Sequence, residues 1–433
     1  MALVLAAATV VLVSRMLLSD VIVPPWQQPD EPIHVSAAEV WRSRISDEDA
    51  ADRGRQAEII ESMIRHGWWR HYQAPLPPGL PPTRFAATGV VFQAIGLEPE
   101  SSSYAPPYYA TVGWLLSLAP RAGVERDLYV MRVVSMLFAV GTLWVGFLGS
   151  RLALGTAGAA TVTSLLAVHP QFAISSTTAA PDAVVNCAGA ILWWQTLSAL
   201  RQASVVRSLA IVWLVAFAAA AIDRLGIALV PIAFAVTVVV VAQRRRWREA
   251  AAVSVVAVVA IGAAIATVPA IRNPLRISLG EALVPSAPGD ALEFTVRFVR
   301  FLFTSWWYSL GWGQYFAPQW WVACAAAITA IAALGVARHS FTCSAATRRI
   351  LTLAAMNIAC FLVALGWVFL RVRVGAQGRY LFPVIIPTLS LMAVGTTAWL
   401  PERLRRVGSA SLVAAVAVLD LCAWILVALP AYL

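Results

Sequence analysis

The chain has 433 residues, of which 60% are hydrophobic and only 12% are charged. Soluble domains carry about 25% charged residues, and the apolar runs of about 20 residues that recur here are each long enough to cross about 30 Å of hydrocarbon. The composition therefore excludes a soluble enzyme and predicts an all-α polytopic membrane protein.

The net charge of +10 comes from arginine alone, because the sequence contains no lysine. In a soluble protein this excess would suggest a nucleic-acid partner. In a membrane protein arginine marks the cytoplasmic loops, so we predict membrane lipids and no nucleic acid as partners. The five cysteines are scattered without metal-ligand or redox spacing, and we interpret them as packing residues.

Residues 2–23 form the first apolar segment, which fits either a retained helix or a signal peptide. No basic residues precede it, and no convincing small-residue cleavage site stands before Pro24. We favour a retained helix, in which Arg15 faces the helix bundle or a lipid phosphate.

The next segment, residues 24–107, is too polar to lie in lipid. Its apolar spacing predicts helices over 31–45 and 48–66, and the prolines of 74–82 require an extended chain. An apolar helix, 108–119, follows, and its aromatic residues favour a place along the membrane interface.

The remaining apolar segments predict ten further crossings, so that the bundle has about eleven transmembrane helices. They are residues 127–150, 157–177, 182–200, 208–222, 224–243, 250–271, 318–337, 350–370, 380–399 and 409–429.

Arginines gather in alternate connections between these spans, which the positive-inside rule assigns to the cytoplasm. These are Arg151, Arg201, Arg207, Arg244, Arg245, Arg246, Arg248, Arg338, Arg348, Arg349, Arg403, Arg405 and Arg406. The rule predicts a multi-pass protein of the inner or plasma membrane with its N-terminus in the cytoplasm and its acidic first loop outside.

A second external loop spans residues 272–317, where 291–304 resembles an interfacial helix with Arg297 and Arg300 at its polar edge. We detect no short-period repeat and no appended soluble domain. The prediction is a single transmembrane domain over 1–433, with external loops at 24–120 and 272–317.

The first candidate for chemistry is the run Pro29-Asp30-Glu31-Pro32-Ile33-His34, directly after the first span. Acidic residues at such a boundary are costly unless they are solvated or functional. One interpretation is a helix N-cap with solvated charges. The other is a general base, or a metal site formed with His34.

The second candidate is Asp182, which opens the span 182–200 from the external side. An aspartate at this position is commonly an N-cap. The predicted topology nevertheless places it on the same membrane face as Asp30, and two carboxylates from different helices in one cavity can serve acid–base or metal chemistry.

The third candidate is an excess of arginine on the external side, where short loops are normally poor in it. The residues are Arg224, beside Asp223, and Arg371, Arg373 and Arg379. Lipid headgroups or an Asp223–Arg224 pair would account for them. So would an anionic ligand, because guanidinium groups match phosphate oxygens.

Taken together, these features predict an external cavity that has carboxylates to activate an acceptor and guanidinium groups to hold a departing phosphate. The aromatic side chains of Tyr108 and Tyr109 suit contact with a sugar or a lipid tail. No glycine-rich phosphate loop appears, which agrees with a donor delivered through the membrane.

An ordered set of motifs resembles a known superfamily. The motifs are Pro29-Asp30-Glu31-Pro32-x-His34, Pro-Pro-Tyr-Tyr at 106–109, Arg132-Val-Val-Ser135, His169-Pro170-Gln171-Phe172, Pro181-Asp182-Ala183 and Gln377-Gly378-Arg379-Tyr380-Leu381-Phe382-Pro383. The set resembles the GT-C superfamily of polyprenyl-phosphate-sugar glycosyltransferases over about residues 1–400. The nearest branch is the bacterial DUF2142 membrane proteins, and protein O-mannosyltransferases and aminoarabinose lipid A transferases are more distantly similar.

The resemblance implies inverting transfer of a hexose or pentose from a polyprenyl-phosphate donor to a cell-envelope glycan, lipid or protein. It implies that Asp30 or Glu31 is the base, with Asp182 as the second acid. Of the two adjacent carboxylates we favour Asp30, because Glu31 lies in the first helical turn.

The same resemblance implies that Arg224, Arg379 and Tyr380 contact the donor. Some relatives use a divalent cation such as Mg²⁺ or Mn²⁺, for which Asp30, His34 and Asp182 would be the ligands here. The chain departs from the pattern at Ala105, where relatives often have histidine.

Two other functions compete with glycosyl transfer. A transporter or flippase would use the same cavity, but transporters usually place ionisable residues near the bilayer midplane, with broken helices and repeats. Here only Asp420 lies that deep, and a buried hydrogen-bonded group would account for it equally well. The third hypothesis is a non-catalytic assembly or lipid-binding subunit.

Overall fold

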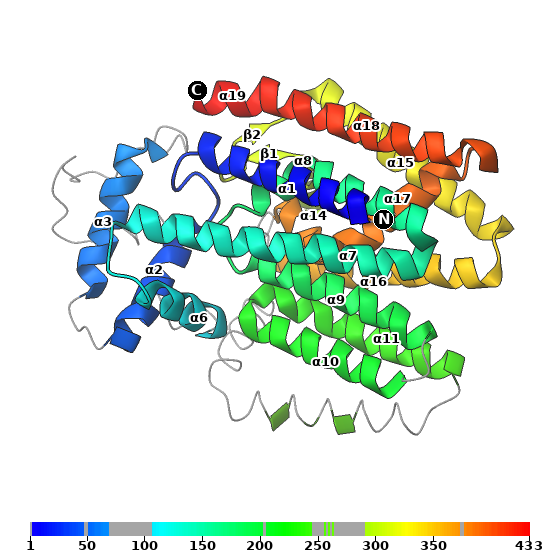
Figure 1. Ribbon diagram of the computed structural model, residues 1–433, viewed down its shortest axis with the longest axis horizontal. Helices are drawn as coiled ribbons and strands as arrows, with labels where there is room; N and C mark the ends of the chain where they lie inside the picture. Colours follow the sequence, from blue (N-terminus) through cyan, green and yellow to red (C-terminus); the bar gives the residue numbers. More distant parts are fainter. Residues whose placement is uncertain are drawn as a thin grey trace.

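The computed structural model describes residues 2–46, 51–68, 106–201, 205–244, 255–256, 259, 262–263, 291–372 and 376–433. Long helices lie side by side along one direction, and three shorter helices cover one end of this bundle (Figure 1). Nine helices of the described ranges are long and apolar enough to cross a membrane. The protein is an all-α polytopic membrane protein, as the composition predicts.

The long helices begin with α1 (Ala2–Ile22), α7 (Val124–Val168), α9 (Asp182–Arg201), α10 (Val205–Ile222) and α11 (Leu229–Arg244). They continue with α15 (Gln319–Thr342), α16 (Ala345–Val372), α17 (Ile385–Thr397) and α18 (Arg405–Ala423). Short helical segments extend them or join them: α8 (Pro170–Ser175), η1 (Arg224–Ala228), η2 (Gly378–Val384), η3 (Glu402–Leu404), η4 (Trp424–Ala428) and α19 (Leu429–Tyr432).

Helix α7 contains two crossings, because its backbone leaves the helical region at Gly155, where φ is 73° and ψ is −175°. This conformation suits glycine, which has no Cβ to clash. The two parts run in opposite directions along α1: Trp144 donates to Thr9 at 3.0 Å, and Arg15 reaches the carbonyl of Ala167. The break thus separates the spans predicted at 127–150 and 157–177, of which the second is itself interrupted at His169, between the end of α7 and α8. The span predicted at 250–271 lies almost wholly outside the described residues.

The three shorter helices form a cap, which consists of α2 (Glu31–Ser46), α3 (Ala51–Arg65) and α6 (Pro106–Ser117) (Figure 1). They confirm the helices predicted at 31–45, 48–66 and 108–119. The predicted extended segment 74–82 lies outside the described residues. Apolar side chains of the cap pack on the start of α7 in one buried cluster that includes Ile59, Tyr109 and Leu128.

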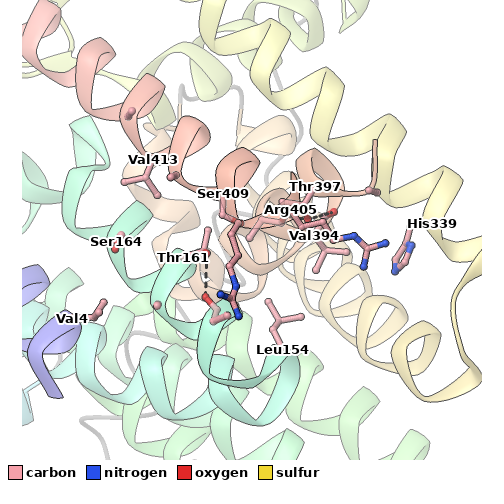
Figure 2. Close-up of a pocket in the computed structure, with 18 of the residues that line it drawn as sticks. Val4, Leu154, Thr161, Ser164, His339, Val394, Thr397, Arg405, Ser409 and Val413 are labelled. Carbon is pink, nitrogen blue, oxygen red and sulfur yellow. Dashed lines mark hydrogen bonds between the residues drawn. The ribbon is translucent and has the colours of Figure 1, made fainter. Parts of the chain in front are cut away.

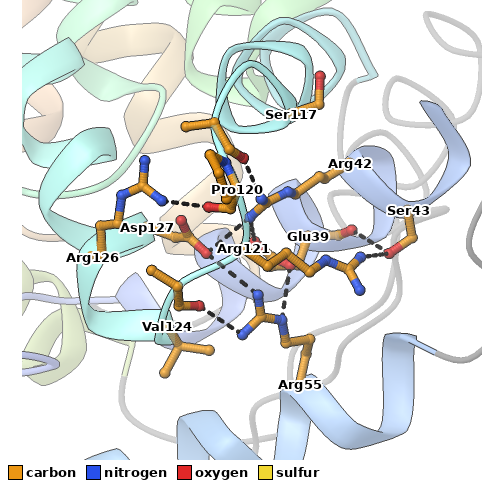
Figure 3. Close-up of polar contacts among 12 residues, drawn as sticks. Glu39, Arg42, Ser43, Arg55, Ser117, Pro120, Arg121, Val124, Arg126 and Asp127 are labelled. Carbon is orange, nitrogen blue, oxygen red and sulfur yellow. Dashed lines mark hydrogen bonds and ion pairs between the residues drawn. The ribbon is translucent and has the colours of Figure 1, made fainter. Parts of the chain in front are cut away.

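A buried network of charges also joins the cap to α7 (Figure 3). Arg42 of α2 lies 3.3 Å from both Glu39 and Asp127, and it donates to the carbonyl of Ala119 at 3.0 Å. Arg55 of α3 contacts Glu39 at 3.2 Å and Asp127 at 3.8 Å. Because carboxylates of α2 and α7 share these two arginines, the network holds the cap in one orientation on the bundle.

The second loop contains α14 (Ala291–Trp307), which confirms the helix predicted at 291–304 and extends it by one turn. A short antiparallel hairpin follows, in which β1 (Ser309–Leu310) pairs with β2 (Tyr315–Phe316), Ser309 opposite Phe316. The loop residues 272–290 lie outside the described part of the chain.

Arg15 faces the bundle, because its guanidinium contacts three segments of it. Its Nη2 lies 2.5 Å from Oδ1 of Asp420 on α18 and donates to the carbonyl of His169 at 3.2 Å, while Nη1 donates to the carbonyl of Ala167. The side chains of Arg15 and Asp420 are each 11% exposed. This pair neutralises the deepest charges of α1 and α18 and holds both helices against the end of α7.

Loss of one partner from this pair leaves an uncompensated charge among apolar helices, which costs about 3–5 kcal/mol. We expect Asp420→Leu to lower the thermal unfolding midpoint of the detergent-purified protein strongly. The double variant Arg15→Met/Asp420→Leu should recover most of the loss, because neither charge remains. A double variant no more stable than Asp420→Leu would contradict this account of the pair.

Candidate functional site

Three side chains that are far apart in the sequence meet at the capped end of the bundle. Asp30 precedes α2, Asp182 opens α9 and Arg379 lies in η2. We refer to these three residues, with His34, Asp223, Arg224 and Tyr380 beside them, as the Arg379 cluster.

Asp30 lies in a strained loop that is fixed from several sides. Its φ is 65° and that of Trp26 is 70°, a left-handed conformation that side-chain-bearing residues rarely adopt. The carbonyl of Trp26 accepts a hydrogen bond from Trp312 at 3.2 Å, and that of Asp30 accepts from the His34 amide at 3.1 Å. Such strain persists only where the surroundings over-determine the backbone, and it gathers at functional sites.

Glu31, adjacent to Asp30, is fully buried and is held by Arg132 of α7. Arg132 donates to both carboxylate oxygens of Glu31, at 2.8 and 2.9 Å, and the amide of Ala179 adds a third hydrogen bond at 3.3 Å. Arg132 also binds Asp20 at 3.0 Å and the carbonyls of Val23 and Pro24, both at 3.3 Å. The pair thus joins α1, α2, α7 and the approach to α9, and Glu31 positions the Asp30 loop.

Arg379 lies in the short 3₁₀ segment η2. Pro383, in the same segment, has no amide hydrogen to donate, so the chain does not form a regular α-helix there. The α-helical part of the span predicted at 380–399 therefore begins only at Ile385. Gly378 packs directly on α14: its amide donates to Ser305 at 2.7 Å, and a Cβ at this position would lie 1.9 Å from the Trp306 nitrogen. Only glycine permits this approach, which carries Arg379 into the cluster.

The guanidinium of Arg379 lies between two carboxylates and is only 4% exposed. Its Nη2 donates to Oδ2 of Asp30 at 2.9 Å, and Nη1 lies 3.5 Å from Oδ2 of Asp182. Nε and Nη1 are buried and have no hydrogen-bond partner among the described residues, and neither has Oδ2 of Asp182. Buried donors are almost always satisfied; Nη1 and Oδ2 of Asp182 at least face each other as an ion pair, so Nε is the atom most open to a ligand.

Asp182 and Asp223 lie close enough to influence each other. Burial, together with the negative charge of Asp182, raises the pKa of Asp223 to about 6. Asp223 also caps η1, since its Oδ1 accepts from the Leu225 amide at 2.7 Å. Two neighbouring carboxylates are a common arrangement for proton transfer.

His34 lies within the electrostatic reach of the whole cluster. Burial, together with the positive charges of Arg379 and Arg224, lowers its pKa to about 4 against the opposing effect of Asp30 and Asp182. Its Nδ1 is 2.6 Å from the hydroxyl of Tyr109. The imidazole is therefore neutral at pH 7 and forms a hydrogen-bonded link between α2 and α6.

The other predicted site residues have different surroundings. Tyr108 and Tyr109 are buried and pack edge to face, 5.1 Å apart, so their rings form part of the cap core. The ring of Tyr380 lies under the guanidinium of Arg379 at 5.2 Å. Arg224 is exposed beside Asp223. The side chain of Arg371 and the whole of Arg373 lie outside the described residues.

The ligand set considered for a divalent cation is not arranged as one. Nδ1 of His34 bonds to Tyr109, and the carboxylates of Asp30 and Asp182 both face the positive charge of Arg379. Within the described ranges, no group of three or more His, Cys, Asp or Glu side chains is placed to hold a metal ion.

Sequence reasoning missed two members of this site as functional residues. Asp223 was interpreted only as a partner of Arg224, and Arg132 only as part of a motif. The signal for Arg132 was available, because it lies five residues after the start of the apolar segment predicted at 127–150, and an arginine inside such a segment requires a buried carboxylate. Asp223 gave no comparable signal, since an aspartate at the end of a span is ordinary.

Comparison with protein families gives one match. The model of DUF2142, described as "Predicted membrane protein (DUF2142)", matches residues 15–389. No curated protein and no solved structure matches the chain.

The Glu31–Arg132 pair gives a stability prediction. Glu31→Gln removes the carboxylate that holds Arg132 through two hydrogen bonds and leaves this fully buried charge only Asp20 as a partner. The loss of a buried ion pair costs up to about 3–5 kcal/mol, so the thermal unfolding midpoint should fall sharply. The matched control is Glu293→Gln, because the Glu293–Arg297 pair is exposed and such pairs contribute little. Equal midpoints for the two variants would show that Glu31 does not hold the loop.

His34 gives a prediction about pH. Its pKa is about 4 in the folded chain and near 6.5 when unfolded, so the unfolded state binds the proton first as the pH falls. Stability should therefore decrease between about pH 6.5 and 4, by up to about 3 kcal/mol. Asp223, whose folded pKa is raised, acts in the opposite direction.

The contribution of His34 to stability is therefore measured by comparing the thermal unfolding midpoints of wild type and His34→Gln at several pH values from 7 to 4.5. The difference should shrink as the pH falls. Parallel pH profiles would mean that His34 does not stay neutral in the folded protein.

Proposed function

This chain belongs to the DUF2142 family of predicted membrane proteins, and we propose that it is a GT-C-type glycosyltransferase. In this proposal it transfers a sugar from a polyprenyl-phosphate carrier to an acceptor of the cell envelope. Asp30 is the base, and Arg379 and Arg224 receive the phosphate.

One observation carries the proposal: Arg379 is buried between two carboxylates, and its Nε and Nη1 form no hydrogen bond within the described residues, although Nη1 lies 3.5 Å from Asp182. A guanidinium presents its donors in a planar fork that matches phosphate oxygens. Two carboxylates beside a phosphate site are what the transfer of a glycosyl group to a hydroxyl requires.

The reaction has one bond-forming step. The acceptor hydroxyl loses its proton to Asp30 as its oxygen attacks the anomeric carbon, on the face opposite the phosphate. The bond between that carbon and the phosphate oxygen breaks, and the electron pair leaves with the phosphate. Arg379 and Arg224 stabilise the charge that develops there, and the configuration inverts.

The ion pair between Asp30 and Arg379 supports a coupling between donor binding and activation of the base. The side chain of Asp30 is 35% exposed and that of Arg379 only 4%, so the carboxylate is the group that can move into solvent. A phosphate that binds Arg379 competes with Asp30 for its donors. Donor binding would thus release the Asp30 carboxylate to accept a proton.

The proposal places this reaction at the external membrane face, with the N-terminus in the cytoplasm. Support comes from α9, which runs from Asp182 in the cluster to Arg201 at the opposite end of the bundle. The connections rich in arginine are at that opposite end, and arginine favours the cytoplasmic side. A donor carried by a lipid would then enter the site through the membrane.

Transport has lost its main support. Asp420 was the one acidic residue deep enough to suggest a transport pathway, and the structure pairs it with Arg15 at 2.5 Å. Its position is explained by neutralisation of that arginine.

The proposal predicts that binding and transfer can be separated by two variants. Arg379→Gln should weaken binding of undecaprenyl phosphate in detergent by at least about tenfold, because it removes a buried charge-assisted contact. Asp30→Asn should bind this probe at least as tightly as wild type, since it removes the competitor, and should abolish transfer. Transfer is measured with a panel of polyprenyl-phosphate hexoses and pentoses on native membranes.

The matched control is Arg300→Gln, which removes an exposed arginine of α14 and should change neither measurement. Full transfer by Asp30→Asn would refute the assignment of the base. Undiminished probe binding by Arg379→Gln would refute the phosphate site.

A further inference from the structure

A second site lies at the other end of the bundle from the Arg379 cluster. It is a cavity of about 770 Å³, walled by the turn of α7, the ends of α15 and α17 and the start of α18 (Figure 2). Val4 of α1 lines it, whereas Asp20, 16 residues further along the same helix, contacts Arg132 beside the cluster. At 1.5 Å per residue the two sites are about 24 Å apart along α1.

The cavity wall has an apolar part and a polar part. Small side chains form the apolar part and leave room along α7, α17 and α18; they are Ala157, Gly158, Ala160, Ala393, Val394, Ala410 and Val413. The polar part consists of Arg405, Arg406 and His339 with several hydroxyl groups. Figure 2 shows Leu154 and Thr161 across the cavity from Ser409 and Val413, with His339 at one side.

The positive charge of this cavity has no internal counterion in the part of the chain that the structure describes. Arg405 and Arg406 contribute to no ion pair there, although every arginine buried in the core of the bundle is paired with a carboxylate. Their guanidinium groups are exposed at the cavity rim, where they can bind an anion that comes from outside the protein.

We propose that this cavity binds one anionic phospholipid. Arg405 and Arg406 hold its phosphate, and an acyl chain lies against the small side chains of α7 and α18. A soluble anion would bind to the arginines but leave the apolar wall exposed to water. A neutral lipid would cover the apolar wall but leave the charges of the arginines uncompensated. Basic pockets between transmembrane helices bind anionic headgroups in this way.

This inference is independent of the proposed transfer reaction, because the two sites share no residue. The proposed ligand is a membrane phospholipid bound at the arginine-rich end of the bundle. The polyprenyl-phosphate donor of the transfer reaction would bind at the opposite end.

The test measures lipid binding to the detergent-purified full chain by native mass spectrometry, with dioleoylphosphatidylglycerol and dioleoylphosphatidylcholine as probes. Wild type should bind dioleoylphosphatidylglycerol about 10- to 30-fold more tightly than dioleoylphosphatidylcholine. The reason is that each of the two arginines adds to the affinity for an anionic headgroup. Arg405→Gln/Arg406→Gln should reduce that preference to near unity.

The matched control is Arg201→Gln/Arg207→Gln, which removes two exposed arginines from the same end of the bundle, outside the cavity. It should keep the preference for the anionic lipid. Ala410→Phe, which fills the apolar part, should weaken binding of both lipids, and unchanged thermal midpoints would show that each variant is folded.

Three results would overturn the proposal. The first is equal affinity for the two lipids in wild type, and the second is an equal loss in the control and cavity variants. The third is displacement of the anionic lipid by millimolar inorganic phosphate together with no effect of Ala410→Phe, which would identify a soluble anion as the occupant.

Discussion

The structure depends on the burial of the Arg379 guanidinium between Asp30 and Asp182. A buried charge is tolerated only when it is paired, because desolvation of an isolated ion costs several kcal/mol. This requirement brings together the loop after α1, the start of α9 and the 3₁₀ segment before α17. The hydrogen-bonding capacity of Arg379 is not fully used, because its Nε and Nη1 form no hydrogen bond within the described residues.

Other buried arginines follow the same rule and complete the scaffold. Arg15 meets Asp420, Arg132 meets Glu31 and Asp20, and Arg42 meets Glu39 and Asp127. Except for Arg42 and Glu39, which both lie on α2, each pair joins elements that are distant in the sequence, and so fixes the relative positions of helices that have little but apolar surface in common. Arg405 and Arg406 at the opposite end are different, because they are exposed and form no ion pair within the described residues.

The site could be predicted in part. Asp30, Asp182 and Arg379 were selected as residues that break the apolar pattern on one side of the membrane, and the structure brings all three into contact. What the pattern could not separate was Asp30 from Glu31. The two are adjacent and chemically similar, and only the position of Arg132 on α7 shows that Glu31 is committed to the scaffold.

The sequence by itself determined the class of protein, the helical spans and the order of the motifs, because hydrophobic length and proline and glycine positions act locally. The tertiary structure alone decided which charges pair, since that depends on distances between helices up to 405 residues apart, as for Arg15 and Asp420. It also decided where polar atoms remain unsatisfied. Local patterns contain no such distances, so the strongest indication of a ligand, the Nε of Arg379 that forms no hydrogen bond within the described residues, emerged only from the folded chain.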